Sequence, residues 1–431
     1  MATVTINTLP KDQWLSFTIN HSALQQVGVT IKTTTNTPYS IDWGDGTIDN
    51  DIPSNSTAIH TFSKTVTILK IKATNGLYDI INFNSTSLNL TGQIKQFNAL
   101  VNLKVLRIYT ENMEGNFLNL NPSLEEFVTK SIIYGASHEM PVNLKVFKLL
   151  KNGSRVWGNL SDLPSTLIEL EVYQSSFVGI IADLPSNLTL LNLHDNIGNV
   201  GGNIGALPIT MIYFRYLGIN VITGSIETLP NLLEFIYIAG QNTINGLLDG
   251  IPSNLTSFTI QGNNTISGTI NNLPTNLKTL NIGGNNTISG NISNLDYTIE
   301  SVIILGLNTI TGLIESTSIK HLTIWGNNTI SGNLSSVPVV NNSQNISIRG
   351  NNTIKNSTVK NYTGITTFNI TIDPVHSSFI SSQIDQMLID LAVVPNIKAF
   401  INLQGINAVR TSASDNAVAT LLTNGGTLIL P

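Results

Sequence analysis

The stretch that decides the fold reads Leu255-Thr-Ser-Phe-Thr-Ile-Gln-Gly-Asn-Asn-Thr-Ile-Ser-Gly-Thr-Ile270. After a Leu-Pro pair it begins again as Leu277-Lys-Thr-Leu-Asn-Ile-Gly-Gly-Asn-Asn-Thr-Ile-Ser-Gly-Asn-Ile292, a step of 22 residues from Leu255 to Leu277. A fixed period of roughly 20 to 50 residues is the mark of a chain built from stacked structural repeats. The sequence therefore predicts a solenoid.

The same frame extends in both directions from this stretch. It gives about twelve coils of 20–24 residues, which begin at Leu103, Leu124, Leu144, Leu167, Leu188, Met211, Leu233, Leu255, Leu277, Ile299, Ile319 and, in degenerate form, Ser343. Apolar residues two positions apart, such as Leu280 and Ile282, have the spacing of one face of a short strand. One coil cannot bury them alone, so the core forms only when coils stack. We predict a mainly β fold with its solenoid over residues 77–360.

The order Leu-x-x-Leu-x-Leu-x-x-Asn, continued by Ile-Ser-Gly-Asn-Ile and Leu-Pro, resembles the leucine-rich repeat in its subtype of 22 to 24 residues. The resemblance implies that Asn263, Asn285, Asn327 and Asn351 are ladder asparagines, whose amides satisfy backbone groups at the turn out of each strand. The doubled asparagines, such as Asn263-Asn264, depart from the pattern because they insert a residue before the next apolar position. A parallel β-helix with 22-residue rungs is the alternative architecture.

Residues 1–76 lack the repeat and predict a separate domain. Their alternating apolar runs, at 14–19, 27–33, 39–43 and 66–71, predict a small antiparallel β-sandwich. The Trp43-Gly-Asp-Gly turn with the downstream His60-Thr-Phe resembles the polycystic-kidney-disease (PKD) domain, an immunoglobulin-like module that usually serves as a spacer or binds proteins.

Three carboxylates near this turn raise the question of a calcium site. Asp42, Asp45 and Asp49 are close in sequence, but no Asp-x-Asp-x-Asp-Gly loop with a closing Glu surrounds them. Aspartates commonly accept hydrogen bonds from turn amides. We therefore interpret the three residues as turn carboxylates and predict no metal site.

Residues 361–431 lose the period and predict a small α/β cap. Helices are expected at 378–394 and 413–422, and strands at 399–403 and 427–430. The strings Ile384-Asp-Gln-Met-Leu-Ile-Asp-Leu391, Ile401-Asn-Leu-Gln-Gly-Ile-Asn-Ala408 and Ser412 to Gly425 resemble a C-terminal module of bacteriophage structural proteins. The aromatic residue that usually follows the final glycine of that module is absent here.

Composition excludes several classes of function. The formal net charge is -5 and 11% of the residues are charged, so the chain lacks the basic stripe that nucleic acid requires. With no cysteine, disulfide and thiolate chemistry are excluded. No apolar stretch reaches the roughly 18 residues of a membrane span, and the start lacks the pattern of a secretion signal. We expect neither nucleic-acid binding nor membrane insertion.

The sequence offers little catalytic chemistry. The six histidines are scattered, and no metal-binding, phosphate-loop, dinucleotide or nucleophile-elbow motif is present. Glu169 with Glu171, or Asp42 with Asp45, could be paired carboxylates, but no partner base accompanies them. We expect a protein that is not an enzyme and needs no cofactor.

The remaining candidate is a binding surface on the concave sheet of the repeats. In a leucine-rich coil the x positions of Leu-x-Leu-x point outward from this sheet. The candidates there are Arg107, Tyr109, Lys148, Tyr173, His194, Arg215, Tyr237 and Trp325, accompanied by Glu171, Asn192, Leu217 and Arg349. Tyr, Trp and Arg are enriched at binding hot spots, although aromatic residues also occur in strands for their β-propensity alone. The run from Arg107 to Tyr237 is the best candidate.

The combined features lead to one functional expectation and two alternatives. The PKD-like domain, the solenoid and the tail together predict a bacteriophage virion structural protein, a tail fibre, baseplate or head-surface component. Its partners would be other virion proteins and a protein or glycan on the host surface. A bacterial cell-surface leucine-rich repeat adhesin is the main alternative. A carbohydrate-active enzyme on a β-helix is the third, and it requires paired acids in a groove.

Overall fold

The computed structural model describes residues 13–85, 87–296, 298–316, 319–338, 342–350, 352–356, 360–372, 379–403, 406 and 408–430. By the proximity of their Cα atoms the residues divide into two compact units. Unit 1 comprises Met1–Gly201 and Arg215–Asn220, and unit 2 comprises Gly202–Phe214 and Val221–Pro431.

Two antiparallel sheets form the N-terminal part of unit 1. The first has the strand order β1-β6-β3-β4, and in the second β2 pairs with both β5 and β7. The strands are β1 (Leu15–His21), β2 (Gln26–Thr33), β3 (Tyr39–Asp42), β4 (Ile48–Ile52), β5 (Thr57–Thr61), β6 (Val66–Ala73) and β7 (Ile80–Ser85). The strands predicted from the alternating runs are present as β1, β2, β3 and β6.

Buried aromatic side chains connect these two sheets. Phe17 of β1 lies 5.5 Å from Phe83 of β7 between ring centroids, and the Tyr39 hydroxyl of β3 donates to Ser56 O at 2.6 Å. Trp43, fully buried, stacks on His60 at 4.7 Å. Strand β7 lies beyond residue 76, and it pairs with β2 on one side and with the first coil strand, β9, on the other. The N-terminal sheet thereby continues into the coils.

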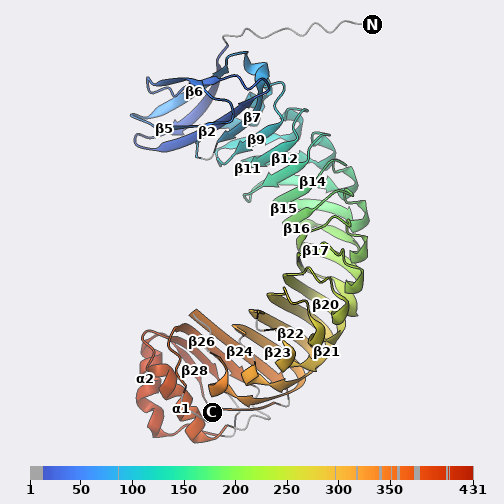
Figure 1. The fold of residues 1–431 in the computed structure, drawn as a ribbon, viewed down its shortest axis with the longest axis vertical. Coiled ribbons are helices and arrows are strands. Elements are labelled where there is room, and N and C mark those ends of the chain that lie inside the picture. Colours follow the sequence, from blue (N-terminus) through green and yellow to red (C-terminus); the bar gives the residue numbers. More distant parts are fainter. Residues whose placement is uncertain are drawn as a thin grey trace. The chain divides into compact units, whose positions relative to one another are not determined.

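Each coil of unit 1 contributes two short strands, or two parts of one long strand, which pair in parallel with their equivalents in the next coil (Figure 1). The two rows of paired strands are called the front sheet and the side sheet below. The front sheet contains β7, β9 (Val105–Ile108), β11 (Glu126–Thr129), β13 (Val146–Leu149) and the first parts of β15 (Glu169–Ile180) and β16 (Leu190–Asn203). The side sheet contains β8 (Gly92–Gln93), β10 (Met113–Asn116), β12 (Ile132–Ala136), β14 (Arg155–Asn159) and the second parts of β15 and β16. The side strand is an element that the leucine-rich pattern alone did not predict.

The coils of unit 2 have the same two strands. Its strands are β17 (Tyr213–Ser225), β18 (Phe235–Ala239), β19 (Thr243–Leu247), β20 (Ser257–Thr269), β21 (Thr279–Asn291), β22 (Ser301–Leu313), β23 (His321–Asn333), β24 (Asn342–Gly350) and β25 (Thr353–Lys355), with residues 215–220 of β17 assigned to unit 1. The front-sheet register runs Ser257, Thr279, Ser301, His321 and Asn345. The strand pairing therefore follows the repeat period predicted from the sequence.

Each coil closes with a short 3-10 helix and a turn into the next coil. The 3-10 helices of the coils are η1 (Leu77–Asp79), η2 (Ile94–Ala99), η3 (Phe117–Asn119), η4 (Ser137–Glu139), η5 (Leu160–Asp162), η6 (Ile181–Asp183), η7 (Ile204–Ala206), η8 (Ile226–Thr228), η9 (Leu248–Gly250), η10 (Ile270–Asn272), η11 (Ile292–Asn294), η12 (Ile314–Ser316) and η13 (Leu334–Ser336), while η14 (Ser412–Ser414) lies in the C-terminal segment. In the turns before Leu144 to Leu277, the amide of the coil-starting residue donates to the proline carbonyl three residues earlier, as from Leu277 to Pro274 at 3.0 Å. The coil-starting residues from Leu103 to Ile319 are at most 2% exposed, so the core predicted from the stacking is present.

The asparagine ladder occupies a different position from the predicted one. Asn264, Asn286 and Asn328, the second members of their doublets, are fully buried, whereas the first members are exposed. The prediction of Asn263, Asn285 and Asn327 as ladder residues was wrong, because the side strand alternates inward and outward and its inward set includes the second asparagine. Asn351 lies outside the described residues.

The C-terminal residues extend the front sheet of unit 2 and add two helices. Strands β26 (Ile365–Ile372), β27 (Lys398–Asn402) and β28 (Thr427–Ile429) continue the parallel pairing from β24. Helix α1 (Ser381–Ala392) buries Ile384, Met387, Leu388 and Leu391, and α2 (Asp415–Thr423) follows it. The predicted helices and strands of this segment are thus present within a few residues. In the described part of the chain, no helix is long and apolar enough to cross a membrane.

Candidate functional site

The front sheet of unit 1 brings several of the predicted binding residues into one row. Strand pairing places Arg107, Val128, Lys148, Glu171 and Asn192 side by side on five successive strands. Their chain neighbours point inward and are buried, since successive side chains of a strand point to opposite faces. The outward side of strands β9, β11, β13, β15 and β16 is called the front face below; Arg107, Lys148 and Glu171 are half-buried there, and Val128 and Asn192 are buried.

Charged pairs line a hollow of about 500 Å³ on the front face. The Arg107 guanidinium pairs with Glu126, and Lys148 Nζ lies 2.5 Å from Glu169 Oε2. Glu171 accepts a hydrogen bond from the Asn192 amide at 3.0 Å. The hollow is lined by Arg107, Tyr109, Glu126, Val128, Val146, Lys148, Leu150, Glu169 and Glu171.

These ion pairs contribute little to the stability of the fold. The Arg107 and Glu126 side chains are 42% and 18% exposed, and pairs of this kind contribute about 0–1 kcal/mol. A charged group of a ligand can therefore replace one member of either ion pair at a small cost in free energy. The front face thus offers alternating positive and negative groups over apolar Val128, Val146 and Leu150.

Tyr173 and His194 extend the front face beyond the hollow. Their rings stack with centroids 5.3 Å apart and an interplanar angle of 26°. His194 Nδ1 lies 3.1 Å from Asp195 Oδ2, but without hydrogen-bond geometry. Arg215 belongs to β17 and is half-buried.

Two of the predicted binding residues belong to unit 2. Tyr237 is on β18, and the ring of Phe235 on the same strand stacks on Tyr213 of β17 with centroids 4.2 Å apart. Trp325 is on β23, with the Arg349 guanidinium 3.8 Å from its ring centroid. Three front strands, β20, β21 and β22, lie between the strands of Tyr237 and Trp325. The residues predicted to form a binding surface therefore lie in several separate places on the coils and do not form a single site.

The sequence reasoning missed the acidic half of the hollow. Glu126 was not among the predicted residues, Glu169 was considered only as a possible catalytic carboxylate, and Glu171 was also named among the outward residues of the concave sheet. In the structure Glu169 faces Lys148 and Glu171 faces Asn192. The available signal was the charge order between coils, Arg107 with Glu126 and Lys148 with Glu169, one strand apart.

The three carboxylates of the N-terminal turn each have protein donors. Asp42 accepts from Gly44 N, Asp49 accepts from the Trp43 indole, and Asp45 accepts from His60, Ser63 and Thr47. Burial alone would raise the pKa of Asp45, but these hydrogen bonds outweigh it and hold the pKa well below its usual range. Within the described residues no group of three or more His, Cys, Asp or Glu side chains could hold a metal ion.

Comparison with models of known protein families gives no match, and no curated protein matches the sequence. Solved structures do match. The leucine-rich repeat ectodomain of the Arabidopsis thaliana receptor kinase GASSHO1/SCHENGEN3, in complex with CASPARIAN STRIP INTEGRITY FACTOR 2, has a TM-score of 0.50 at 14% identity over 77% of this chain. The solenoid is of the leucine-rich repeat type. The chain spans 47% of that ectodomain, about half its length.

Two further receptor structures match with lower scores. The plant peptide hormone receptor RGFR1, in complex with RGF2, has a TM-score of 0.43 at 17% identity, covering 74% of this chain and 68% of the receptor. A TDR receptor has a TM-score of 0.43 at 18% identity, covering 76% and 68%.

Proposed function

We propose that this protein is a non-catalytic binding solenoid whose front face in unit 1 holds a protein partner. The observation that carries the proposal is the hollow of alternating charges, formed by Arg107 with Glu126 and Lys148 with Glu169. Groups of both signs above an apolar floor suit a folded polypeptide surface that presents complementary charges. The matching GASSHO1/SCHENGEN3 ectodomain was solved in complex with CASPARIAN STRIP INTEGRITY FACTOR 2, which supports a binding role for a solenoid of this type.

We further propose that the protein is a bacteriophage virion component that serves host attachment, as a tail fibre, baseplate or head-surface protein. The support is the resemblance of residues 384–425 to the C-terminal module of phage structural proteins, together with the PKD-like turn at Trp43. Its partners would be other virion proteins and a protein or glycan on the host surface. A bacterial cell-surface adhesin would use the same front face, so location distinguishes the two proposals.

The location is tested by mass spectrometry of purified virions, with immunogold labelling by an antibody against residues 103–360. We expect the protein in the particles, with the label on the tail or the head surface. Absence from the particles, with label on bacterial cells instead, would overturn the virion proposal and support the adhesin.

The front face is tested by competition. The isolated protein should block adsorption of particles to host cells, because it occupies the receptor. The double variant R107E/K148E reverses both cations beside Glu126 and Glu169 and should weaken this block at least tenfold, about 1.4 kcal/mol. The control K278E reverses an exposed cation of unit 2 and should block as well as the wild type. Equal blocking by all three proteins would exclude the front face.

A further inference from the structure

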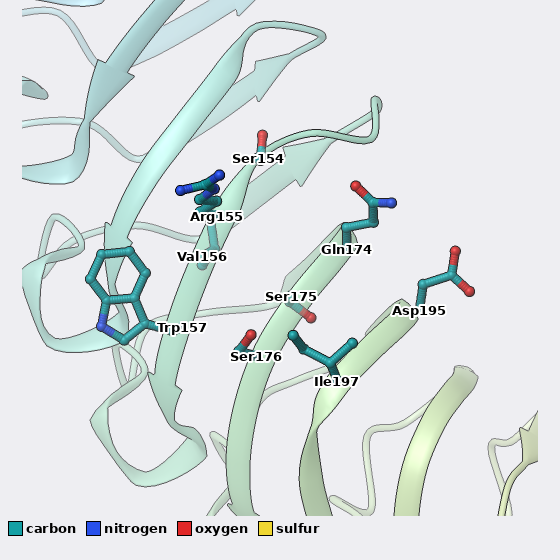
Figure 2. Close-up of a pocket in the computed structure, with 9 residues that line it drawn as sticks. All are labelled: Ser154, Arg155, Val156, Trp157, Gln174, Ser175, Ser176, Asp195 and Ile197. Atoms are coloured by element: carbon teal, nitrogen blue, oxygen red, sulfur yellow. The ribbon is translucent and has the colours of Figure 1, made fainter.

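A second hollow lies on the side sheet of unit 1, outside the front face. Its volume is about 700 Å³, within the roughly 300–1,000 Å³ range of small-molecule sites. Figure 2 shows its lining, which comes from three successive coils: Ser154, Arg155, Val156, Trp157, Gln174, Ser175, Ser176, Asp195 and Ile197.

The hollow has an apolar row formed by one residue from each coil. Strand pairing places Ser176 beside Trp157 on one side and beside Ile197 on the other. Trp157 is 45% exposed and Ile197 is 72% exposed, whereas the serine between them is small. Because neighbouring strands lie about 4.8 Å apart, Trp157 and Ile197 form walls about 10 Å apart over a hydroxyl-bearing floor.

A polar row runs parallel to the apolar one, two residues earlier on each strand. It consists of Arg155, Gln174 and Asp195, each exposed. The Gln174 Oε1 atom accepts from Gly153 N at 2.8 Å, which holds the side chain in place, and its amide nitrogen has no partner among the described residues. The row thus presents a guanidinium and an amide as donors and a carboxylate as acceptor.

The backbone of this polar row differs from the backbone at the same position in the later coils. Gln174 and Asp195 have left-handed φ angles of 59° and 54° at the corner between the front and side strands. Later coils place glycine at their corners, as at Gly262 and Gly284. A non-glycine residue in this conformation carries a free-energy cost, and such costs concentrate at ligand sites. Two neighbouring coils bear this cost, and both side chains border the same hollow.

We propose that this hollow is a binding site for a neutral pyranose, the terminal sugar of an oligosaccharide. The apolar C–H face of the ring stacks on Trp157, since aromatic rings offer a large and rigid apolar surface. Its hydroxyls, which both donate and accept, reach Arg155, Gln174 and Asp195 about two residues, or 7 Å, away along the strands. One positive and one negative group leave the row with no net charge, which matches an uncharged sugar.

A bound peptide fits these observations less well. Extended peptides commonly add to an unpaired sheet edge. Here β14 pairs with β12 and β15, and β15 pairs with β14 and β16, so the hollow lies over fully paired strands. A ligand there has only side chains and no open backbone edge to bind. This site is independent of the front face and of the proposed virion location.

The test measures binding of the full chain to immobilised neutral mono- to tetrasaccharides of glucose, galactose, mannose, N-acetylglucosamine and rhamnose, in both anomers. Three variants accompany the wild type. W157A removes the stacking surface, and D195N removes the acceptor charge with a residue that tolerates a left-handed backbone. L247A is the control, because Leu247 is also 45% exposed and lies on side strand β19 in unit 2. Far-UV circular dichroism checks that all variants fold.

We expect the wild type and L247A to bind at least one of these sugars with equal affinity. W157A should bind it at least tenfold more weakly, and D195N should fall between them. The proposal is overturned if none of the sugars binds at millimolar concentration, or if W157A binds like the wild type. It is also overturned if binding is lost in R107E/K148E instead, because the sugar would then occupy the front face.

Discussion

At the scale of single residues, a buried asparagine in the later coils joins three successive coils. Asn286 Oδ1 accepts from Ile266 N of the preceding coil at 2.9 Å, and its amide donates to Leu305 O of the following coil at 2.9 Å. Asn308 repeats this arrangement with Ile288 N and Trp325 O. Both groups are buried, and a buried polar group without a partner is costly. The ladder therefore holds each coil to the next at its corner.

The variant N286A should destabilise the solenoid by about 1–3 kcal/mol, because Ile266 N and Leu305 O lose their common partner. The matched variant N285A removes an exposed amide from the same doublet and should change the stability by less than about 0.5 kcal/mol. Urea unfolding measures the stability, and hydrogen exchange at the Ile266 amide reports the lost bond directly. Equal effects of both variants would show that the doublet does not act through its buried member.

The sequence predicted that asparagines form a ladder but not which member of the doublet takes part. The sequence contained the information needed to choose. Ile266 points inward, and because side chains alternate along a strand, Asn264 also points inward and Asn263 points outward. At the front face, the sequence predicted Arg107 and Lys148 from their positions in the coil. Their partners Glu126 and Glu169 come from adjacent strands, and the pairing register decided which charges meet.

At the scale of elements, the C-terminal helices were predictable from their apolar spacing, but the polar contacts that join them were not. Asp385 of α1 accepts from Thr411 N at 3.0 Å, Thr411 Oγ1 at 2.6 Å and Ser414 Oγ at 2.6 Å, at the start of α2. These partners are 26 and 29 residues away in sequence, so no local pattern connects them. Burial opposes the charge of Asp385, but the hydrogen bonds of Ser414 and Thr411 lower its pKa below the usual value.

The variant D385A should loosen α1 from α2 and cost about 1–3 kcal/mol at neutral pH, because three donors lose their acceptor. The lowered pKa adds a pH dependence. A carboxylate whose folded-state pKa is depressed stabilises the fold above its unfolded pKa of about 3.9, and this contribution disappears as the pH falls further.

Hydrogen exchange of the α1 amides measures this effect from pH 7 to pH 3. Exchange protection in the wild type should fall below about pH 4, and the difference from D385A should shrink there. The control D415A breaks the exposed pair with Arg410, in which the Asp415 side chain is 60% exposed, and should follow the wild type. A constant difference between wild type and D385A across this range would contradict the role of the Asp385 charge.

At the scale of the whole molecule, the period of the sequence predicted the stacked coils, because the same apolar positions must meet in every coil. The period did not predict the side strand, which arises from the polar Asn-Asn-Thr-Ile-Ser-Gly segment. Only the isoleucine among these six residues has an apolar side chain, so the leucine-rich pattern does not predict a strand there. In the structure it pairs in parallel from coil to coil, as Ser267 with Thr287 and Ser289 with Thr309.

A solenoid whose coils contact mainly their neighbours should tolerate the loss of one complete coil. Deletion of residues 277–298 removes 22 residues and joins Asn276 to Ile299, so each inward position of one coil meets its equivalent in the next. Asn264 then faces Leu305 O, as Asn286 does in the intact chain. Deletion of residues 277–287 removes half a coil and turns apolar residues toward solvent.

We expect the protein that lacks one complete coil to keep its far-UV circular dichroism spectrum and a melting temperature within about 5 °C of the wild type. The protein that lacks half a coil should lose cooperative unfolding. If both deletions unfold alike, the coils are not interchangeable, and the stability of unit 2 depends on contacts specific to each coil rather than on the repeat.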